Sequence, residues 1–502
     1  MGIWNNDAGI LISFLPLCSP FPPIPRGGPE SPLLPLSASI WRLIMAALLS
    51  DALVFFGITS DLAYKKIFPA LQAMIQRGHF DIPIIGVGRR DWSIEQLQSY
   101  VRKSLEEQAR VDEVAFQKLC SLLYYICGDY SDRATYDKLC QVLQIAEAPL
   151  YYLAIPPSLF ATVVEGLGQS SCVKNGRVMV EKPFGRDLKS AKILNCILHS
   201  IFPESHIFRI DHYLGKEPVQ NLLYTRFANS LLEPIWHRVS IASIQITMAE
   251  KFGIDGRGQF YEETGAIRDV VQNHLLQVTA CLMIDPPINE QHEAIRDERA
   301  RLLKSIDPIE PSNVVRGQYK GYRQEPGVAP DSKVETFAAV KLNIDTWRWA
   351  SVPIYIRAGK CLPSTTTEVV VRLKRPPQDV FGERAFGLAN YFYFRLSPNV
   401  LTAIGIRSKT PGDGMVGSEV GLVAQVEHGN EMNPYERLFE DAMKGDSMLF
   451  ARQDEVEAQW QIVAPILDQA TPVYEYAPHS WGPPLADHMI PPDGGWHNLN
   501  ET

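Results

Sequence analysis

The stretch ALVFFGITSDL, residues 52–62, decides the expected fold of the first half of the chain. Its first five residues are apolar and end at Gly57, a pattern that indicates a short buried strand. Thr59 or Ser60 can cap the helix whose apolar pattern then continues to about Arg77. A strand, a tight turn and a helix start in this order can bind a pyrophosphate through free backbone N–H groups. The full Gly-x-Gly-x-x-Gly fingerprint is absent, so an ordinary capped helix stays open as an alternative.

Strands and helices alternate throughout the first half of the chain. The further expected strands cover residues 82–88, 151–155, 177–180 and 205–210, and helical patterns cover 158–167 and 188–201. This alternation predicts a mostly parallel sheet with helices on both faces, which is a Rossmann-like α/β domain. Ligands of such sheets bind at the carboxyl ends of the strands. We therefore expect Gly57, Arg89, Lys182 and Asp211 to face one crevice.

The second half has a different pattern. Longer alternating strands are expected at 239–247, 367–373, 391–396 and 401–407, with helices between them. They predict an α+β domain with a large, mainly antiparallel sheet. The expected division is a disordered N-terminal extension at 1–44, a dinucleotide-binding domain at 45–220 and an α+β substrate domain at 221–502.

The extension is distinguished by its composition. Residues 15–35 are rich in Pro, Ser and Gly, and no basic n-region precedes the apolar stretch 10–17, although a signal peptide stays an alternative. Met45 could be the true initiator, in which case residues 1–44 are not translated. The apolar run 40–49 is shorter than the ~18 residues that a membrane span needs, so we expect no membrane association.

Composition also limits the classes of function. At 502 residues and 46% hydrophobic, the chain can form more than one core. A net charge of -9 argues against a nucleic-acid partner, and any site for an anion must be locally basic. The 8 cysteines show no metal-ligand spacing, which predicts free thiols in a reducing cytoplasm and no metal site.

The sequence RIDHYLGKE at 209–217 predicts a site for a phosphorylated ligand. Asp211, His212 and Lys216 lie between an expected strand and a helix whose first turn contains Pro218. Basic side chains beside free N–H groups of a helix start favour phosphate. We assign His212 and Lys216, with Tyr213 beside them, to the phosphate of the substrate.

The pair Arg89-Arg90 follows the expected strand 82–88 and bears on the coenzyme. A protein that binds NAD usually has a carboxylate here for the ribose hydroxyls. An arginine suits a ribose phosphate instead, which predicts NADP. Asp91 follows directly and leaves NAD possible as a secondary coenzyme. Two solvated loop arginines are the alternative interpretation.

His274 lies on an apolar stripe of the expected helix 265–278. A desolvated imidazole has a lowered pKa and stays neutral, so it can accept a proton if a carboxylate orients its other nitrogen. Asp211 is the expected partner. A core histidine whose hydrogen bonds are satisfied locally is the alternative.

From about residue 52 to about residue 490, the chain resembles the glucose-6-phosphate dehydrogenase family. The motifs that carry the resemblance are GITSDLA at 57–63, the segment 86–90, EKPFG at 181–185, DHYLGK at 211–216, QNH at 272–274 and the C-terminal stretch 479–487. The resemblance implies oxidation of D-glucose 6-phosphate to 6-phosphogluconolactone with NADP, the first step of the oxidative pentose phosphate pathway. It also implies pairing through the large sheet, as a homodimer or a dimer of dimers, although composition alone would allow a monomer.

The same resemblance assigns roles to residues. It implies that Asp211 and His274 form the catalytic pair and that Lys182 lies between coenzyme and sugar. It implies sugar contacts from Glu250, Asp269 and Lys360. The implied coenzyme contacts are Gly57, Ser60, Asp61, Leu62, Arg89 and Lys182.

Several points stay open from the sequence alone. Ser60 stands where the family usually has Gly, which puts the closest approach of a pyrophosphate in doubt. On an ideal α-helix Asp269 projects away from His274, so a solvent-exposed carboxylate is an alternative. Pro183 could simply end a strand. The segment 364–367 lacks the basic residues that some family members carry there, which weakens the case for a second coenzyme site.

Two alternative functions also stay open. One is a broader hexose-phosphate or free-glucose dehydrogenase, and within it His212 and Lys216 argue for a phosphorylated substrate. The other is a catalytically silent paralogue that binds NADP(H) or a sugar phosphate, which Ser60 would support and the intact Asp211 and His274 oppose.

Overall fold

The computed structural model describes residues 49–498 except 109, 171, 379, 383–388, 413, 425–431, 469 and 491–494. The expected extension at 1–44 and the proposed initiator Met45 lie outside the described residues. None of the helices in the described part of the chain combines the length and the apolar character needed to span a bilayer. Seven cysteines are described and all are free thiols, as expected.

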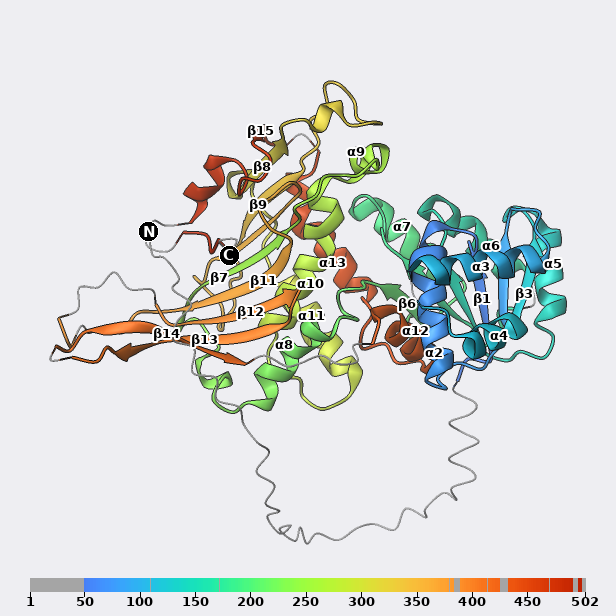
Figure 1. The fold of residues 1–502 in the computed structure, drawn as a ribbon, viewed down its shortest axis with the longest axis horizontal. Helices are drawn as coiled ribbons and strands as arrows, with labels where there is room; N and C mark the ends of the chain where they lie inside the picture. The colour runs from blue at the N-terminus through green and yellow to red at the C-terminus, as the bar shows by residue number, and fades with distance from the viewer. Residues whose placement is uncertain are drawn as a thin grey trace, which may run out of the picture. The chain divides into compact units, whose positions relative to one another are not determined.

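The first half forms a six-stranded sheet with the order β3-β2-β1-β4-β5-β6 (Figure 1). Its strands are β1 (Ala52–Phe56), β2 (Ile84–Gly88), β3 (Leu123–Cys127), β4 (Pro149–Leu153), β5 (Arg177–Glu181) and β6 (Ile207–Ile210). All neighbouring strands are parallel. This is the order of a doubly wound dinucleotide-binding domain, whose crevice opens where the order reverses, between β1 and β4. The Rossmann-like prediction is confirmed.

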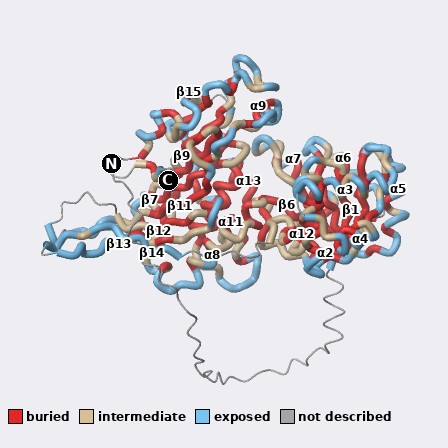
Figure 2. The backbone as a smooth tube through the Cα atoms, in the orientation of Figure 1, coloured by how far each residue is buried: buried red, intermediate tan, exposed pale blue. Residues whose placement is uncertain are grey.

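Helices cover both faces of this sheet. They are α2 (Phe68–Gln76), α3 (Ile94–Gln108), α4 (Glu113–Leu122), α5 (Arg133–Val142), α6 (Phe160–Gln169) and α7 (Leu188–His199). Asp112, Asp132 and Asp187 cap α4, α5 and α7 by accepting backbone N–H bonds. All five residues of β1, β2 and β4 are buried. Figure 2 shows that the helices around the sheet carry exposed residues. Strands buried on both faces explain why these segments are apolar without alternation.

The second half forms a nine-stranded sheet with the order β14-β13-β12-β11-β7-β10-β9-β8-β15 (Figure 1). Its strands are β7 (Ile241–Ala249), β8 (Val314–Tyr319), β9 (Phe337–Leu342), β10 (Ile354–Gly359), β11 (Thr366–Leu373), β12 (Tyr391–Ser397), β13 (Leu401–Lys409), β14 (Gly417–Ala424) and β15 (Val473–Tyr476). Only the pairs β7–β10 and β8–β15 are parallel among these described strands. The predicted large, mainly antiparallel sheet is confirmed.

The helices of the second half pack on this sheet and on each other. They are α8 (Glu217–Ala228), α9 (Gly258–Ala266), α10 (Leu276–Met283), α11 (His292–Lys304) and α13 (Gln453–Val463). A π-helix, η5 (Ile267–Leu275), connects α9 to α10 and contacts β10. Their apolar side chains share one buried cluster with β7, β9, β10 and β11.

The helix α12 (Pro434–Lys444) packs against the first sheet although it follows the strands of the second. Leu438, Phe439 and Ala442 are fully buried in the cluster that contains β1. The ring of Phe439 lies 5.0 Å from that of Tyr152 in β4. The chain therefore crosses to the second half at α8 and returns at α12. The domain boundary at residue 220 stays a prediction.

Gly57 ends β1 in a backbone conformation that requires glycine. Its φ is +81°, and a Cβ at this position would lie 2.3 Å from the carbonyl oxygen of Ala154 after β4. The turn after β1 therefore approaches the end of β4 more closely than a side chain would allow.

We expect Gly57→Ala to destabilise the protein more than Gly78→Ala. Gly78 also has a positive φ, +73°, but no atom would lie within 4 Å of a Cβ at this position, so alanine there incurs only the left-handed strain of about 1–2 kcal/mol. The clash with Ala154 should add about 1–3 kcal/mol to the loss at Gly57. Urea unfolding without coenzyme measures both. Equal losses for the two variants would contradict a close approach at Gly57.

Candidate active site

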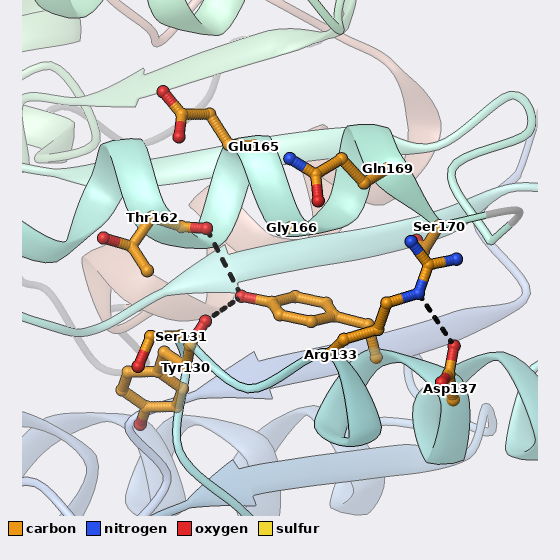
Figure 3. Close-up of a pocket in the computed structure, with 10 residues that line it drawn as sticks. Tyr130, Ser131, Arg133, Asp137, Thr162, Glu165, Gly166, Gln169 and Ser170 are labelled. Carbon is orange, nitrogen blue, oxygen red and sulfur yellow. Dashed lines mark hydrogen bonds and ion pairs between the residues drawn. The ribbon is translucent and has the colours of Figure 1, made fainter.

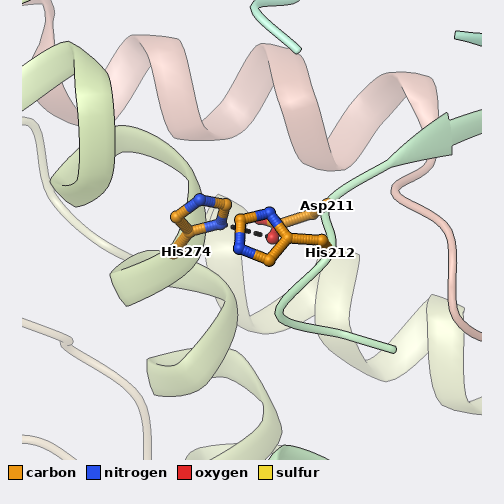
Figure 4. Close-up of side chains that lie close together, drawn as sticks. All are labelled: Asp211, His212 and His274. Carbon is orange, nitrogen blue, oxygen red and sulfur yellow. Dashed lines mark hydrogen bonds and ion pairs between the residues drawn. The ribbon is translucent and has the colours of Figure 1, made fainter. Parts of the chain in front are cut away.

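Asp211 and His274 meet in the interior of the protein (Figure 4). Asp211 directly follows β6, and His274 lies near the end of η5, 63 positions later in the chain. The Nδ1 atom of His274 lies 2.5 Å from Oδ1 of Asp211. Their side chains are 2% and 3% exposed. The contact on which the sequence hypothesis depended is present.

The surroundings keep the imidazole of His274 neutral. Burial lowers its pKa well below the usual range, and the ammonium group of Lys182 lowers it further. Nδ1–H of the neutral ring donates to Asp211, whose Oδ1 also accepts a bond from the backbone N–H of Tyr213. Nε2 is then the acceptor, and Nζ of Lys182 donates to it at 2.9 Å. Burial raises the pKa of Asp211, while His212 and Lys182 oppose that rise.

The π-helix changes which residues share a face with His274. Five residues span about 500° of an ideal α-helix, which would put Asp269 on another face from His274. The wider turn of η5, with its i→i+5 bonds, puts them on the same side. Oδ1 of Asp269 lies 3.4 Å from Nζ of Lys182, and its side chain is only 19% exposed. The solvent-exposed alternative for Asp269 is therefore wrong.

Asp269 is an acid held ionised beside cations. Burial alone would raise its pKa, but Lys182 and Lys360 outweigh that effect and hold the pKa below its ordinary value. Its backbone oxygen accepts a second bond from Lys182 at 2.9 Å. Lys182, which follows β5 in the first half, therefore bonds to both Asp269 and His274 on η5 in the second half.

Glu335 positions the start of the helix that carries His274, and sequence reasoning missed it. Its carboxylate accepts a bond from the backbone N–H of Ile267 at 3.1 Å and pairs with the buried Arg316. Gly265 has a φ of +61°, and a Cβ there would lie 2.5 Å from the same carboxylate. The sequence shows a glycine at 265, where the expected helix begins. No local pattern indicates that residue 335 caps this helix.

His212, Tyr213 and Lys216 line the other side of His274. The ring of Tyr213 stacks on His274 with centroids 4.5 Å apart, and its hydroxyl lies 3.3 Å from Oγ1 of Thr367. Nζ of Lys216 lies 3.7 Å from the centre of the Tyr213 ring. Burial lowers the pKa of Lys216 to about 8, and it lowers that of His212 well below its usual range. Lys216 is the N-cap of α8, so its charge lies at the positive end of the helix dipole.

Glu250 and Lys360 form an ion pair at 2.5 Å. Each directly follows a strand, β7 for Glu250 and β10 for Lys360, and these strands are parallel neighbours. The carboxyl ends of parallel neighbours lie at one edge of a sheet, so the two side chains meet there. Lys360 is 3% exposed. Both residues were predicted from the sequence to contact the sugar, and their pairing was not.

The loop after β1, residues 57–63, is held by hydrogen bonds between its own residues. Ser60 N–H donates to the oxygen of Gly57 at 2.9 Å, and Oγ of Ser60 accepts from the N–H of Ala63 at 3.2 Å. Of the two possible caps, Ser60 is the one used. Asp61 is exposed and Leu62 is half-buried. The turn at Gly57 has the tight, glycine-dependent form that dinucleotide-binding domains have after their first strand.

Arg89 and Arg90 are exposed at the carboxyl end of β2. The guanidinium group of Arg90 lies 4.8 Å from the ring centre of Trp92, and the hydroxyl of Tyr125 donates to the backbone oxygen of Arg90 at 2.6 Å. These contacts order the loop that follows β2. They leave both arginines at the edge where an adenosine ribose binds in such folds.

Glu181, which ends β5, is a further acid that sequence reasoning did not single out. The hydroxyl of Tyr152 in β4 donates to its Oε1 at 2.7 Å. Desolvation raises the pKa of Glu181 to about 7. The residue lies in the EKPFG motif beside Lys182, but only the neighbouring strand reveals its phenol partner.

Two other features could hold a ligand, a cluster of metal-ligand side chains and a separate pocket. In the described part of the chain, Asp211, His212 and His274 are the group of side chains close enough to share an ion. A hydrogen-bond distance of 2.5 Å between two would-be ligand atoms and the nearby Lys182 cation argue against a metal there. A pocket of about 180 Å³ between α5 and α6 is lined by Tyr136, Glu165 and their neighbours (Figure 3). It contains none of the predicted site residues.

Comparison with known proteins decides the family. The model described as "Glucose-6-phosphate dehydrogenase, NAD binding domain" matches residues 54–221, and "Glucose-6-phosphate dehydrogenase, C-terminal domain" matches 223–497. The chain belongs to the glucose-6-phosphate dehydrogenase family. A family with this first domain supports a nicotinamide dinucleotide as the coenzyme.

Several members of the glucose-6-phosphate dehydrogenase family are similar to this chain over most of their length. Glucose-6-phosphate 1-dehydrogenase 1 of Mycobacterium tuberculosis is 43% identical over 450 residues, covering 89% of this chain and 96% of the relative. Glucose-6-phosphate 1-dehydrogenase 6, cytoplasmic, of Arabidopsis thaliana is 37% identical over 467 residues, covering 88% and 90%.

Two solved structures have the same fold. The glucose-6-phosphate 1-dehydrogenase of Mycobacterium avium is 41% identical with a TM-score of 0.85, covering 90% of this chain and 99% of that one. A glucose-6-phosphate dehydrogenase in complex with its substrate glucose-6-phosphate is 33% identical with a TM-score of 0.83 and the same coverage.

We expect Lys182→Met to raise the pKa of His274. Removal of a cation that lies 2.9 Å from Nε2 stabilises the imidazolium form. A pH titration of ring-labelled histidine by NMR measures the change, with assignment by His274→Asn. Lys189→Met, at an exposed site on α7, is the control and should leave the titration of His274 unchanged. An identical titration in Lys182→Met would contradict the contact.

Proposed function

We propose that this protein oxidises D-glucose 6-phosphate at its anomeric carbon to 6-phosphogluconolactone and transfers the hydride to NADP. This is the first step of the oxidative pentose phosphate pathway. The observation that carries the proposal is the buried hydrogen bond between Asp211 and His274, with Nε2 of His274 pointing toward Lys182. Family membership supports the same reaction.

Oxidation of a cyclic hemiacetal requires a base for the anomeric hydroxyl while hydride leaves from the same carbon. His274 is neutral and accepts that proton at Nε2 in the proposed mechanism. Asp211 holds the ring in the required tautomer and stabilises the imidazolium that forms. The nicotinamide ring of the bound coenzyme supplies the hydride acceptor. General-base catalysis of this kind contributes roughly 10²–10⁴-fold.

Nζ of Lys182 donates to the acceptor atom of His274, Nε2. In the proposed mechanism, the anomeric hydroxyl replaces the Lys182 ammonium group as the donor to Nε2 of His274. Lys182 then stays beside Asp269, which already binds it through two oxygen atoms. This arrangement supports the proposed place of Lys182 between coenzyme and sugar.

The substrate is proposed to bind through its two ends. His212, Tyr213 and Lys216 form the phosphate side, where Lys216 adds its charge to the positive end of the α8 dipole. Glu250, Asp269 and Lys360 form the side of the sugar hydroxyls. Binding energy from the phosphate can then position the reacting carbon against His274, because it acts away from the bond that breaks.

The coenzyme is proposed to lie across the crevice between β1 and β4. Gly57, Ser60, Asp61 and Leu62 would contact its pyrophosphate, and Lys182 would approach its reactive end. Arg89 would bind the ribose phosphate of NADP, with NAD as a secondary coenzyme because Asp91 is adjacent. Oγ of Ser60 accepts the N–H of Ala63, so the hydroxyl proton of Ser60 would be the group that donates to a phosphate oxygen.

The substrate assignment is tested by the formation of reduced coenzyme from glucose 6-phosphate and from glucose. We expect the wild type to favour glucose 6-phosphate strongly, and we expect His274→Asn to lose about 10²–10⁴-fold in kcat. His79→Asn, an exposed histidine on the first domain, is the matched control. Equal activity with both sugars would remove the phosphate-binding argument. Activity with neither sugar would favour a silent paralogue.

The coenzyme assignment is tested by Arg89→Ala. We expect KM for NADP to rise about tenfold or more while KM for NAD changes little, because only NADP carries the ribose phosphate. Arg102→Ala removes an exposed arginine from α3 and is the charge-matched control. Equal effects of Arg89→Ala on both coenzymes would contradict the assignment.

We further propose that the protein acts in the cytoplasm and assembles through its large sheet as a homodimer or a dimer of dimers. The cytoplasmic Arabidopsis relative supports the location. Exposed apolar side chains on β14, among them Val420, Leu422 and Val423, support sheet-mediated assembly. Such residues on an edge strand are a natural surface for another chain.

A further inference from the structure

A series of buried polar contacts joins the strand before Asp211 to another part of the chain. The backbone oxygen of Arg209 on β6, two residues before Asp211, accepts from the N–H of Ala451 at 3.1 Å in an antiparallel bridge. The preceding carbonyl, of Phe450, accepts from Nη2 of Arg299 at 3.1 Å. Nη1 of Arg299 donates to the oxygen of Met448 at the same distance. Arg299 therefore holds the segment that pairs with β6.

The same arginine leads to the helix that carries His274. Nε of Arg299 on α11 lies 3.3 Å from Oε1 of Glu455, which is in the first turn of α13. The other oxygen of Glu455 accepts from Nε2 of Gln277 at 3.0 Å. Gln277 follows His274 by three residues, at the start of α10. Figure 1 shows α10, α11 and α13 beside one another.

The side chains of Arg299, Glu455 and Gln277 are almost completely buried. Glu455 and Gln277 are 0% exposed, and Arg299 is 1% exposed. An ion pair this deep is a weak source of stability, because apolar side chains of similar size often serve as well or better. The hydrogen bonds of this ion pair require a specific geometry, however. They connect it to the two segments that carry Asp211 and His274.

We propose that Arg299, Glu455 and Gln277 are positioning residues that set the hydrogen bond between Asp211 and His274. The ion pair holds β6, through residues 448–451, in register with the helix of His274. The inference rests on the proposed function, because that bond orients the base. A second hydrogen bond also joins α13 to the helix of His274. Nε2 of Gln459 on α13 lies 3.4 Å from the backbone oxygen of Asn273.

The test breaks the connection at Gln277 and leaves the ion pair in place. Gln277→Met keeps the side-chain length and removes the donor to Glu455. We expect kcat to fall about tenfold or more, because small displacements of catalytic groups are costly, while KM for glucose 6-phosphate stays within about twofold. The downfield proton signal of Nδ1–H of His274, assigned by its loss in His274→Asn, should shift or broaden.

Gln72→Met is the matched control. Gln72 on α2 is also buried, and its Nε2 donates to the backbone oxygen of Arg110 at 2.9 Å, away from the helix of His274. We expect it to lower the melting temperature without changing kcat or the proton signal. Wild-type kcat and an unchanged signal in Gln277→Met would overturn the proposal.

A double variant tests the ion pair itself. Single substitutions at Arg299 or Glu455 leave a buried charge unpaired and can prevent folding. Arg299→Met with Glu455→Leu removes both charges, and we expect a folded protein with lowered kcat and a shifted signal. A folded double variant with wild-type kcat would also overturn the proposal. A wild type inactive on glucose 6-phosphate would instead refute the proposed function, and the proton signal would still test the positioning.

Discussion

The hydrogen bond between His274 and Asp211 is the contact on which the site depends. It joins the end of a strand in the first sheet to a helix that packs on the second sheet. Because both side chains are almost fully buried, the neutral imidazole with Nδ1–H toward the carboxylate is the favoured state. Nε2 is then the only acceptor of the ring, and Lys182 shows where that acceptor points.

The backbone around His274 explains how so many polar side chains reach one place. Gly265 and Glu335 start the helix, and the π-helical turn then brings Asp269 to the side of His274. π-Helical turns are frequent at functional sites, where they redirect side chains. On the second sheet, the parallel ends of β7 and β10 present Glu250 and Lys360 together.

The two ends of the site differ in their physical character. At the end proposed for the coenzyme, Gly57 is buried in its tight turn and Arg89 is exposed. At the end proposed for the sugar, the buried Lys360 is paired with the partly exposed Glu250. Lys182 and Glu181 lie between these ends, and burial raises the pKa of Glu181 to about 7. Because β5 pairs with β6, its last residue and the following lysine lie beside the strand end that leads into Asp211.

The sequence by itself determined the local elements and most of the chemistry. The apolar runs of β1, β2 and β4, the caps and the motif at 211–216 are local signals, because burial and capping leave patterns within a few residues. It also predicted the side chains of the site, including Asp211, His274 and Lys360, and their roles stay predictions. Only the tertiary structure decided which of them touch. The pairing of Asp211 with His274, of Glu250 with Lys360 and of Glu455 with Gln277 joins residues far apart in the chain, and the return of α12 to the first sheet has the same character. Such contacts are set by packing and strand order, and neither leaves a pattern within a short stretch of sequence.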